Sequence, residues 1–250
     1  ELMKIRGIPI RLHPSWFAIL FLLSWSGRQT FLEAAQSPLS NGLSWGLGLI
    51  FALLLFISIL LHELAHVLVG LHEGVRFPYI QFFLLGVFTG PPEPDFKKAL
   101  SALRVAVAGP IISVVLGISF LAGQHQAVHL NPLFGILLKQ LGGLNMLYAL
   151  FNLLPGLPLD GGHILKALVW QWTGSQRKGV QVATATGRVL FLSAMFLGGW
   201  LLFFKEGAHI GGLWLLILGW FGLSTSRSQT QLLALQKVLR ELNVGQAAGR

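Results

Sequence analysis

The chain has 250 residues, of which 54% are hydrophobic and only 11% are charged, and its formal net charge is +9. Soluble globular proteins carry about 25% charged residues, so this composition excludes an ordinary soluble domain and indicates a polytopic membrane protein. The basic residues are dispersed at the ends of apolar segments, which argues against a nucleic-acid-binding surface. Because the chain has no cysteine, a transition-metal site would need histidine and carboxylate ligands.

Apolar windows predict six membrane spans, so the expected fold class is an all-α polytopic membrane protein. The windows lie at residues 12–27, 43–71, 99–122, 139–170, 186–204 and 209–223. The first follows basic residues, as a signal peptide does, but it lacks a small-residue cleavage site and we expect it to be retained. We interpret residues 1–224 as one six-span domain. For residues 225–250 the sequence predicts a cytosolic amphipathic helix or linker.

The second window ends in the sequence His62-Glu63-Leu64-Ala65-His66, after a run from residue 45 to residue 61 without a charge. On a helix this spacing places two imidazoles one turn apart on one face, where both can bind zinc. Glu63 is then placed to act as general base on a water activated by the metal. The alternative is a satisfied polar cluster between helices. The motif in this context indicates hydrolytic chemistry within a membrane.

Residues 74–92 are rich in β-branched and aromatic residues, with Gly and Pro at both ends. This pattern predicts short strands that enter the membrane, a small β element beside the helices. An edge strand here would bind an unwound substrate by strand addition and expose its peptide bond. On this hypothesis, proline in place of Tyr79 or Gln81 abolishes cleavage and leaves zinc bound.

The fourth window contains Asp160, its only acidic residue, among prolines and glycines that should break the helix. A carboxylate at membrane depth is costly without a partner, and Asp160 lies about as far along its span as the histidines lie along theirs. It is therefore a candidate third ligand, or alternatively a cap for the following helix. The side chain of Asn152 is a candidate partner for a backbone carbonyl freed near Pro155.

The distribution of basic residues predicts the orientation in the membrane. Six spans place both termini on one side, and that side then holds 15 of the 18 Lys and Arg residues, against 3 on the other. Cytosolic segments of membrane proteins are enriched in Lys and Arg. Both termini are therefore expected in the cytosol.

The two motifs together resemble those of the site-2 protease family of intramembrane zinc metalloproteases. The residues that carry the resemblance are the HELAH sequence and the segment from Asn152 to Gly161, with support from Ala108-Gly109-Pro110 and from residues 7–16. The resemblance implies one zinc per chain, held by His62, His66 and Asp160, with Glu63 as catalytic base. It also implies that Asn152 contacts substrate near the scissile carbonyl. The likeness is to the subgroup without a PDZ domain, whose members often continue into C-terminal CBS domains.

These observations predict an intramembrane zinc endopeptidase that cuts within or near transmembrane segments of other proteins. The expected partners are a transmembrane substrate held as an extended strand and the lipid bilayer, with no nucleic acid, and a homo-oligomer is compatible with the sequence. The expected location is a bacterial or archaeal inner membrane, and a plastid membrane is the alternative. The alternatives are a divalent-cation transporter and a zinc-binding membrane-protein adaptor. A transporter usually shows repeated halves, and none is visible in this sequence.

Overall fold

The computed structural model describes residues 3–35, 38–83, 86–90, 95–205, 207 and 209–225. The chain divides into two compact units, Glu1–Leu153 and Leu154–Arg250. Among these described residues, the first unit holds a small sheet and four helices, and the second holds three helices. The expected amphipathic helix or linker after residue 225 lies outside the described residues.

A four-stranded sheet stands at one end of the first unit, in the order β1-β2-β3-β4. Its strands are β1 Met3–Ile5, β2 Ile8–Leu12, β3 Ile80–Phe83 and β4 Gly86–Thr89. The β1–β2 and β3–β4 pairs are antiparallel, whereas β2 and β3 run parallel. The strands predicted in residues 74–92 are confirmed as β3 and β4. The two strands before residue 13 were not predicted, although Ile8, Ile10 and Leu12 alternate as in a strand.

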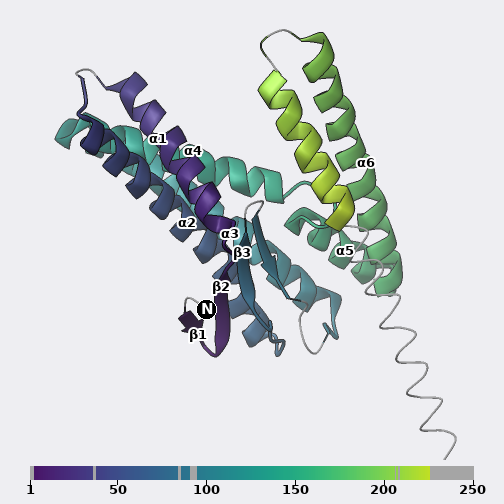
Figure 1. Cartoon of the computed structure of the whole chain (residues 1–250). Helices are drawn as coiled ribbons and strands as arrows, with labels where there is room; N and C mark the ends of the chain where they lie inside the picture. The colour runs from purple at the N-terminus through teal and green to yellow at the C-terminus, as the bar shows by residue number, and fades with distance from the viewer. Residues whose placement is uncertain are drawn as a thin grey trace, which may run out of the picture. The chain divides into compact units, whose positions relative to one another are not determined.

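Four helices form the rest of the first unit, and Figure 1 shows them as two antiparallel pairs. They are α1 Trp16–Ala34, α2 Asn41–His72, α3 Ala99–Leu130 and α4 Pro132–Asn152. Helix α2 packs against both α1 and α3, and α3 packs against α4. Only Asn131 separates α3 from α4, and its side chain accepts a hydrogen bond from the amide of Leu133. This cap, followed by Pro132 at the first helical position, stops α3 and starts α4 within one residue.

The apolar core of the first unit has two parts. One joins the sheet to α1, α2 and α3 through Ile10, Ile80 and Val67, all of which are at most 2% exposed. The other joins α1, α2 and α4 through Phe31 and Leu141. The first part fixes the sheet against the end of α2 that carries the two histidines.

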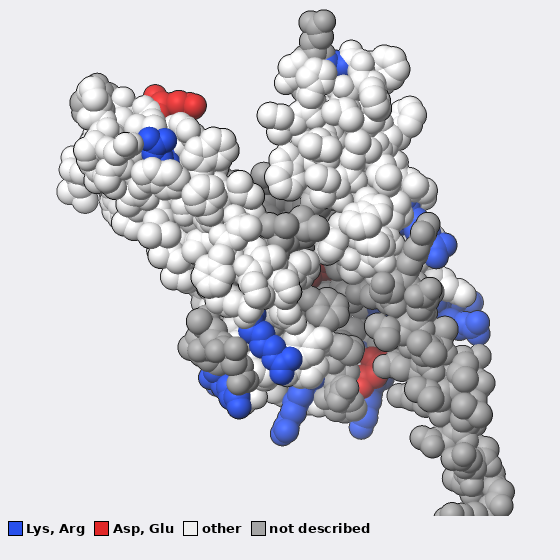
Figure 2. All heavy atoms as spheres, in the orientation of Figure 1, with Lys and Arg blue, Asp and Glu red and all other residues white. Residues whose placement is uncertain are grey.

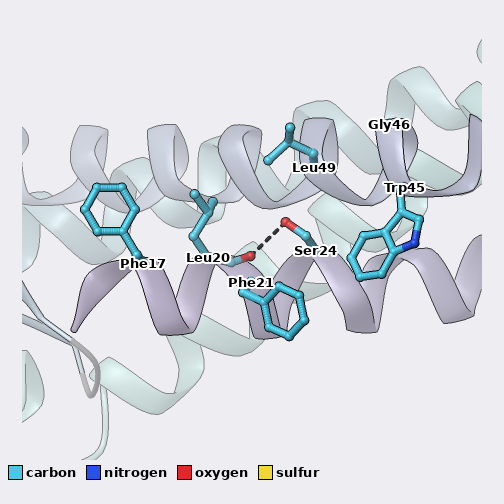
Figure 3. A pocket seen from close by; sticks show the side chains of 7 residues that line it. All are labelled: Phe17, Leu20, Phe21, Ser24, Trp45, Gly46 and Leu49. Atoms are coloured by element: carbon cyan, nitrogen blue, oxygen red, sulfur yellow. Dashed lines mark hydrogen bonds between the residues drawn. The ribbon is translucent and has the colours of Figure 1, made fainter. Parts of the chain in front are cut away.

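An open apolar groove runs between α1 and α2 on the same unit (Figure 3). Its volume is about 390 Å³, and its lining includes Phe17, Phe21, Trp45 and Leu49. The one hydroxyl in the lining, that of Ser24, donates to the carbonyl of Leu20 at 2.7 Å. The groove therefore offers no unsatisfied hydroxyl, as expected for a helix pair that faces hydrocarbon.

Basic side chains gather at the end of the first unit that carries the sheet (Figure 2). Of the nine Lys and Arg residues in this unit, only Arg28 and Lys139 lie toward the opposite end of the helices. At the sheet end, Arg104 of α3 forms a 2.9 Å ion pair with Glu73, the residue that follows α2. Hydrogen bonds from Ser101 and Arg104 hold the pKa of the Glu73 carboxyl below its usual range. The orientation predicted from these basic residues stays a prediction.

The described part of the second unit, up to residue 225, contains α5 Asp160–Thr173, α6 Gln176–Phe204 and a further helix, His209–Thr225. Residues 153–159 between α4 and α5 are not helical, as the prolines and glycines predict. A Cβ on Gly162 would overlap the backbone of Gly156 and Leu157, so the first turn of α5 packs directly on that connection. The αL residue Gly174 ends α5.

The expected count of six spans is not confirmed. Four helices among the described residues, α2, α3, α4 and α6, are long and apolar enough to cross a membrane. The first and last predicted spans are helices, but α1 does not meet these criteria and His209–Thr225 is a shorter apolar helix. The predicted span 139–170 is two helices, because its Pro and Gly residues interrupt it. The third span was predicted too short, since α3 continues to Leu130.

Candidate metal centre

Two histidines lie on one face of α2, in the last third of the helix before the sheet. His62 is 1% exposed and His66 is 9% exposed. Their Nε2 atoms are 3.2 Å apart. The apolar sequence before them makes the helix, and the spacing of four residues places both rings on the same side. The arrangement predicted from the HELAH sequence is confirmed for this pair.

Helix α3 holds both rings by their Nδ1 atoms. Nδ1 of His66 lies 2.7 Å from the carbonyl oxygen of Val105, and Nδ1 of His62 lies 2.9 Å from Oγ of Ser113. A carbonyl only accepts, so Nδ1 of His66 carries the proton and its Nε2 presents a lone pair. The Ser113 hydroxyl can accept from His62 in the same way. Such bonds fix the tautomer and the ring orientation that a metal ligand needs.

Gly109 lies on α3 midway between these two contacts and faces the gap between the histidines. A Cβ built on Gly109 would lie 2.5 Å from Nε2 of His62 and would also overlap Nε2 of His66. Any side chain at this position would therefore occupy the space in front of both nitrogens. The absence of a side chain at Gly109 keeps this space open.

The distance between the two nitrogens suits a tetrahedral zinc site. With Zn–N bonds of about 2.0–2.1 Å, a tetrahedral angle gives an N···N separation of roughly 3.3 Å. The two Nε2 atoms already have nearly this separation. If both histidines present lone pairs, a cation between them removes the repulsion. The described residues of the first unit thus fit two of the ligands of a zinc ion.

Glu63 lies beside this pair and contacts the edge strand of the sheet. The hydroxyl of Thr89, the last residue of β4, donates to Oε2 of Glu63 at 3.0 Å. Glu63 is half-buried, and the bond fixes one of its two oxygens. The edge strand β4 is therefore joined directly to the expected catalytic base.

Helix α4 closes the centre on another side. The ring of Tyr148 stands edge-on to the ring of His62, with centroids 4.9 Å apart at 67°. Asn152, the last residue of α4, donates from Nδ2 to the carbonyl of Tyr148 at 3.1 Å. This carbonyl lies within α4 and is not one freed near Pro155, so the sequence alternative for Asn152 stays a prediction. Its carbonyl oxygen keeps its capacity to accept hydrogen bonds.

Asp160 belongs to the second unit, where it is the first residue of α5 and is half-buried. The residue at the cap position is Leu159, which forms no side-chain cap hydrogen bond. Asp160 therefore does not occupy the N-cap that the alternative interpretation gave it. An acidic residue in the first turn is favoured by the helix dipole.

Residues 50–131 and 130–195 match the sequence pattern of peptidase family M50. This chain belongs to that family. The match includes the histidine pair, Gly109, Asn152 and Asp160. The HELAH sequence and the segment from Asn152 to Gly161, which carry the resemblance to site-2 proteases, both lie in the matched residues.

Curated relatives of the chain are named zinc metalloproteases. The chain is 40% identical over 228 residues to the putative zinc metalloprotease sll0528 of Synechocystis, which covers 90% of this chain and 58% of that protein. It is 34% identical over 247 residues to the putative zinc metalloprotease Rip3 of Mycobacterium tuberculosis, covering 98% and 62%. The chain thus spans about three fifths of the length of these two relatives.

The fold is similar to the solved structure of a site-2 protease from Methanocaldococcus jannaschii. The TM-score is 0.58 at 26% sequence identity, and the match covers 91% of this chain and 93% of that one. Membership of M50 and the four long apolar helices identify the chain as an integral membrane protein. The metal expected for the histidine pair is accordingly zinc.

Sequence reasoning missed four residues of the centre. Val105, Ser113, Thr89 and Tyr148 contact the histidines or Glu63, but none belongs to a metal or catalytic motif. The sequence did contain one indication of this face. Val105, Gly109 and Ser113 are spaced four residues apart and therefore share one face of α3. Thr89 and Tyr148 are brought to the site only by the tertiary fold.

Proposed function

We propose that this chain is an intramembrane zinc endopeptidase that hydrolyses peptide bonds within or near transmembrane segments of other proteins. The observation that carries the proposal is the buried pair of Nε2 atoms on an apolar helix, with a carboxylate beside it. Membership of M50 and the names of the relatives support the same chemistry.

We propose His62, His66 and Asp160 as the ligands of one zinc ion. The paired rings supply two nitrogens, and a carboxylate completes a three-ligand set with a fourth position open. When bound, zinc lowers the pKa of a water to about 7 and polarises the substrate carbonyl. Asp160 is the acidic residue of the second signature that the sequence shares with the site-2 protease family.

Glu63 is the proposed general base. Its Oε2 accepts from Thr89, which leaves Oε1 to take the proton of the attacking water. The same carboxyl then passes the proton to the amine that leaves when the C–N bond breaks. Thr89 restricts the rotation of Glu63, so the base is already oriented before the reaction.

Asn152 is proposed to contact substrate near the scissile carbonyl. Its Nδ2 donates to the carbonyl of Tyr148 in this structure, and an amide nitrogen has two hydrogens. The second hydrogen is the one that could serve a developing oxyanion. Asn152 is in the same unit as His62 and is linked to it through Tyr148.

The substrate is proposed to bind as an extended strand along β4. Gly90 donates to the carbonyl of Tyr79, so by the alternation of an antiparallel ladder the amides of Val87 and Thr89 point away from β3. Within the described residues no strand lies beyond β4. A helical substrate has no free amides, and pairing with this edge would hold it unwound.

The sequence hypothesis tested the substrate-binding edge at Tyr79 and Gln81, whereas the edge strand of this sheet is β4. Gln81 is on β3, which pairs with β2 and β4, so proline at this position would break the sheet itself. Tyr79 accepts the hydrogen bond of Gly90 and is likewise part of the inner ladder. Substitutions that test substrate binding belong on β4.

The proposed orientation places the sheet and the metal centre toward the cytosol, with both termini cytosolic, in a prokaryotic inner membrane. The concentration of basic residues at the sheet end of the first unit supports it.

The first experiment compares the wild-type chain with Glu63→Gln in detergent, measuring zinc content and cleavage of a single-span substrate. We expect about one zinc per chain in both, and cleavage by the wild type only. Asp160→Asn should lose both zinc and cleavage. Zinc in the wild type without cleavage of any substrate would favour the adaptor, and zinc flux in vesicles would favour the transporter.

A further inference from the structure

A small apolar cavity lies beside the metal centre, entirely within the first unit. Its volume is about 90 Å³, and it is enclosed by α1, α2, the β3–β4 strands and α4. The lining is aliphatic and aromatic and includes Leu23, Ala52 and Val87. Its polar side-chain groups are the indole N–H of a tryptophan and the hydroxyl of Tyr148. It is distinct from the open groove between α1 and α2.

Tyr148 connects this cavity to the catalytic residues. Its ring lines the cavity and also stands against the ring of His62, 4.9 Å away. The cavity therefore begins one side chain away from a proposed zinc ligand. A group that enters it is adjacent to the place where the peptide bond would be cut.

The edge strand β4 also connects the cavity to the catalytic residues. Thr89 bonds Glu63, and Val87, two residues earlier on β4, lines the cavity. Side chains two residues apart on a strand share one face and are about 6.7 Å apart. The same face of β4 thus runs from the proposed base to the cavity.

A strand added to β4 repeats this alternation. When the side chain of one substrate residue lies beside Thr89, the side chain two residues away lies beside Val87, at the cavity. We propose that the cavity is a selectivity pocket, which receives a small aliphatic side chain of the substrate a short distance from the bond that is cut. This inference rests on the proposed function and on strand addition to β4.

The size and lining of the cavity indicate which side chains fit. An engineered cavity of about 150 Å³ in another protein accommodates benzene, so one of 90 Å³ suits Val or Leu better than Phe or Trp. A charged side chain would lose its hydration there and find no partner of opposite charge in the lining. One methylene in an apolar pocket changes kcat/KM by roughly 10–200-fold. We therefore expect Leu or Val to exceed Gly by at least about tenfold at one substrate position.

The test first locates the bond that wild-type protein cuts in a single-span substrate, by mass spectrometry. Each substrate residue within three positions of that bond is then varied among Gly, Ala, Val, Leu, Phe and Asp. At one position the wild type should prefer Val or Leu and reject Asp. Ala52→Leu, which fills the cavity, should reverse that preference toward Gly or Ala by about tenfold at the same position.

Leu23→Ala is the opposite change and should shift the preference toward Phe. Ala18→Leu is the control, because Ala18 is exposed on α1, and it should leave all ratios unchanged. The readout is a ratio of kcat/KM values for one enzyme, so partial loss of folded protein cancels. Unchanged ratios in both cavity variants, with an active wild type, would overturn the pocket alone. Absence of cleavage by the wild type would instead overturn the proposed function.

Discussion

At the scale of single residues, the metal centre depends on groups that carry no chemistry of their own. Gly109 contributes space, and Val105 and Ser113 contribute acceptors that orient the imidazoles. The motif specifies the two histidines, but α3 decides whether their Nε2 atoms are accessible and unprotonated. Residues of this kind give the clearest tests, because they affect metal binding without removing a ligand.

Gly109→Ala should abolish zinc binding. The new methyl group would overlap both Nε2 atoms, and the backbone of α3 cannot retreat without losing its contacts with the histidines. Zinc content per purified chain, measured by elemental analysis, is the readout. Gly123→Ala on the same helix is the control, since a Cβ there meets only Leu138 at 3.5 Å. Full zinc occupancy in Gly109→Ala would show that the metal does not lie between the histidines and α3.

Ser113→Ala should weaken zinc binding by about 10–100-fold, the usual effect of removing a group that orients a ligand. His62 would keep its ring but lose the partner of Nδ1. Competition with a chromogenic chelator measures the change. Ser119→Ala serves as the matched control, because the Ser119 hydroxyl donates to the carbonyl of Val115 in its own helix and is exposed. Equal affinities in the two variants would contradict a role for Ser113.

Thr89→Val should lower kcat by about tenfold or more, because a hydrogen bond to a charged group contributes roughly 1.5–3 kcal/mol. The substitution keeps the shape and the β propensity of the side chain but removes the donor to Glu63. Zinc content should be unchanged, and Thr89→Ser should restore most of the activity. Steady-state kinetics on the single-span substrate separates kcat from KM. An unimpaired Thr89→Val enzyme would mean that Glu63 is oriented by other groups.

At the scale of elements, the sequence best predicted long apolar helices and the helix interruptions caused by proline and glycine. The length of the apolar run gave α2, and the prolines and glycines after Asn152 gave the interruption between α4 and α5. The pairing of β2 with β3 could not be predicted, since these strands are almost 70 residues apart in the chain. The end of α3 was misplaced because Gln124, His125 and Gln126 lower the hydropathy after residue 122, whereas these residues belong to the last turns of the helix.

The edge strand gives the prediction that belongs to this scale. Val87→Pro removes an amide that faces away from β3, so the β3–β4 ladder keeps its hydrogen bonds while a docking substrate loses one. The preceding residue, Gly86, tolerates the restriction that proline imposes. We expect KM to rise several-fold with zinc content unchanged. Val87→Ala keeps the amide and should retain more affinity, and equal KM values in the two variants would place the substrate elsewhere.

At the scale of the whole molecule, composition alone identified a membrane protein, and M50 membership agrees with that. The number of spans did not follow from composition, because hydropathy does not distinguish a crossing helix from a short or broken one. The ligand set is a similar case. The sequence pairs Asp160 with the histidines by family signature and by depth, but only a metal measurement on Asp160 variants tests that pairing.

The orientation is testable because the chain has no cysteine of its own. Single cysteines can replace Lys97, exposed at the sheet end, and Glu33, exposed at the opposite end of α1. We expect a membrane-impermeant maleimide to label Glu33→Cys in intact cells, and Lys97→Cys only after the membrane is opened. The reverse pattern would invert the orientation. Labelling of both in intact cells would contradict a span between these positions.

The contact between Thr89 and Glu63 has a consequence for where a substrate is cut. A strand that slides along β4 by one residue turns every side chain to the other face, whereas a slide by two restores the original arrangement. Val87 and Thr89 both belong to the face that meets the centre. The bonds cut in minor products should therefore lie two residues from the major cleavage site rather than one. Alternative cleavage sites would then be spaced by dipeptides.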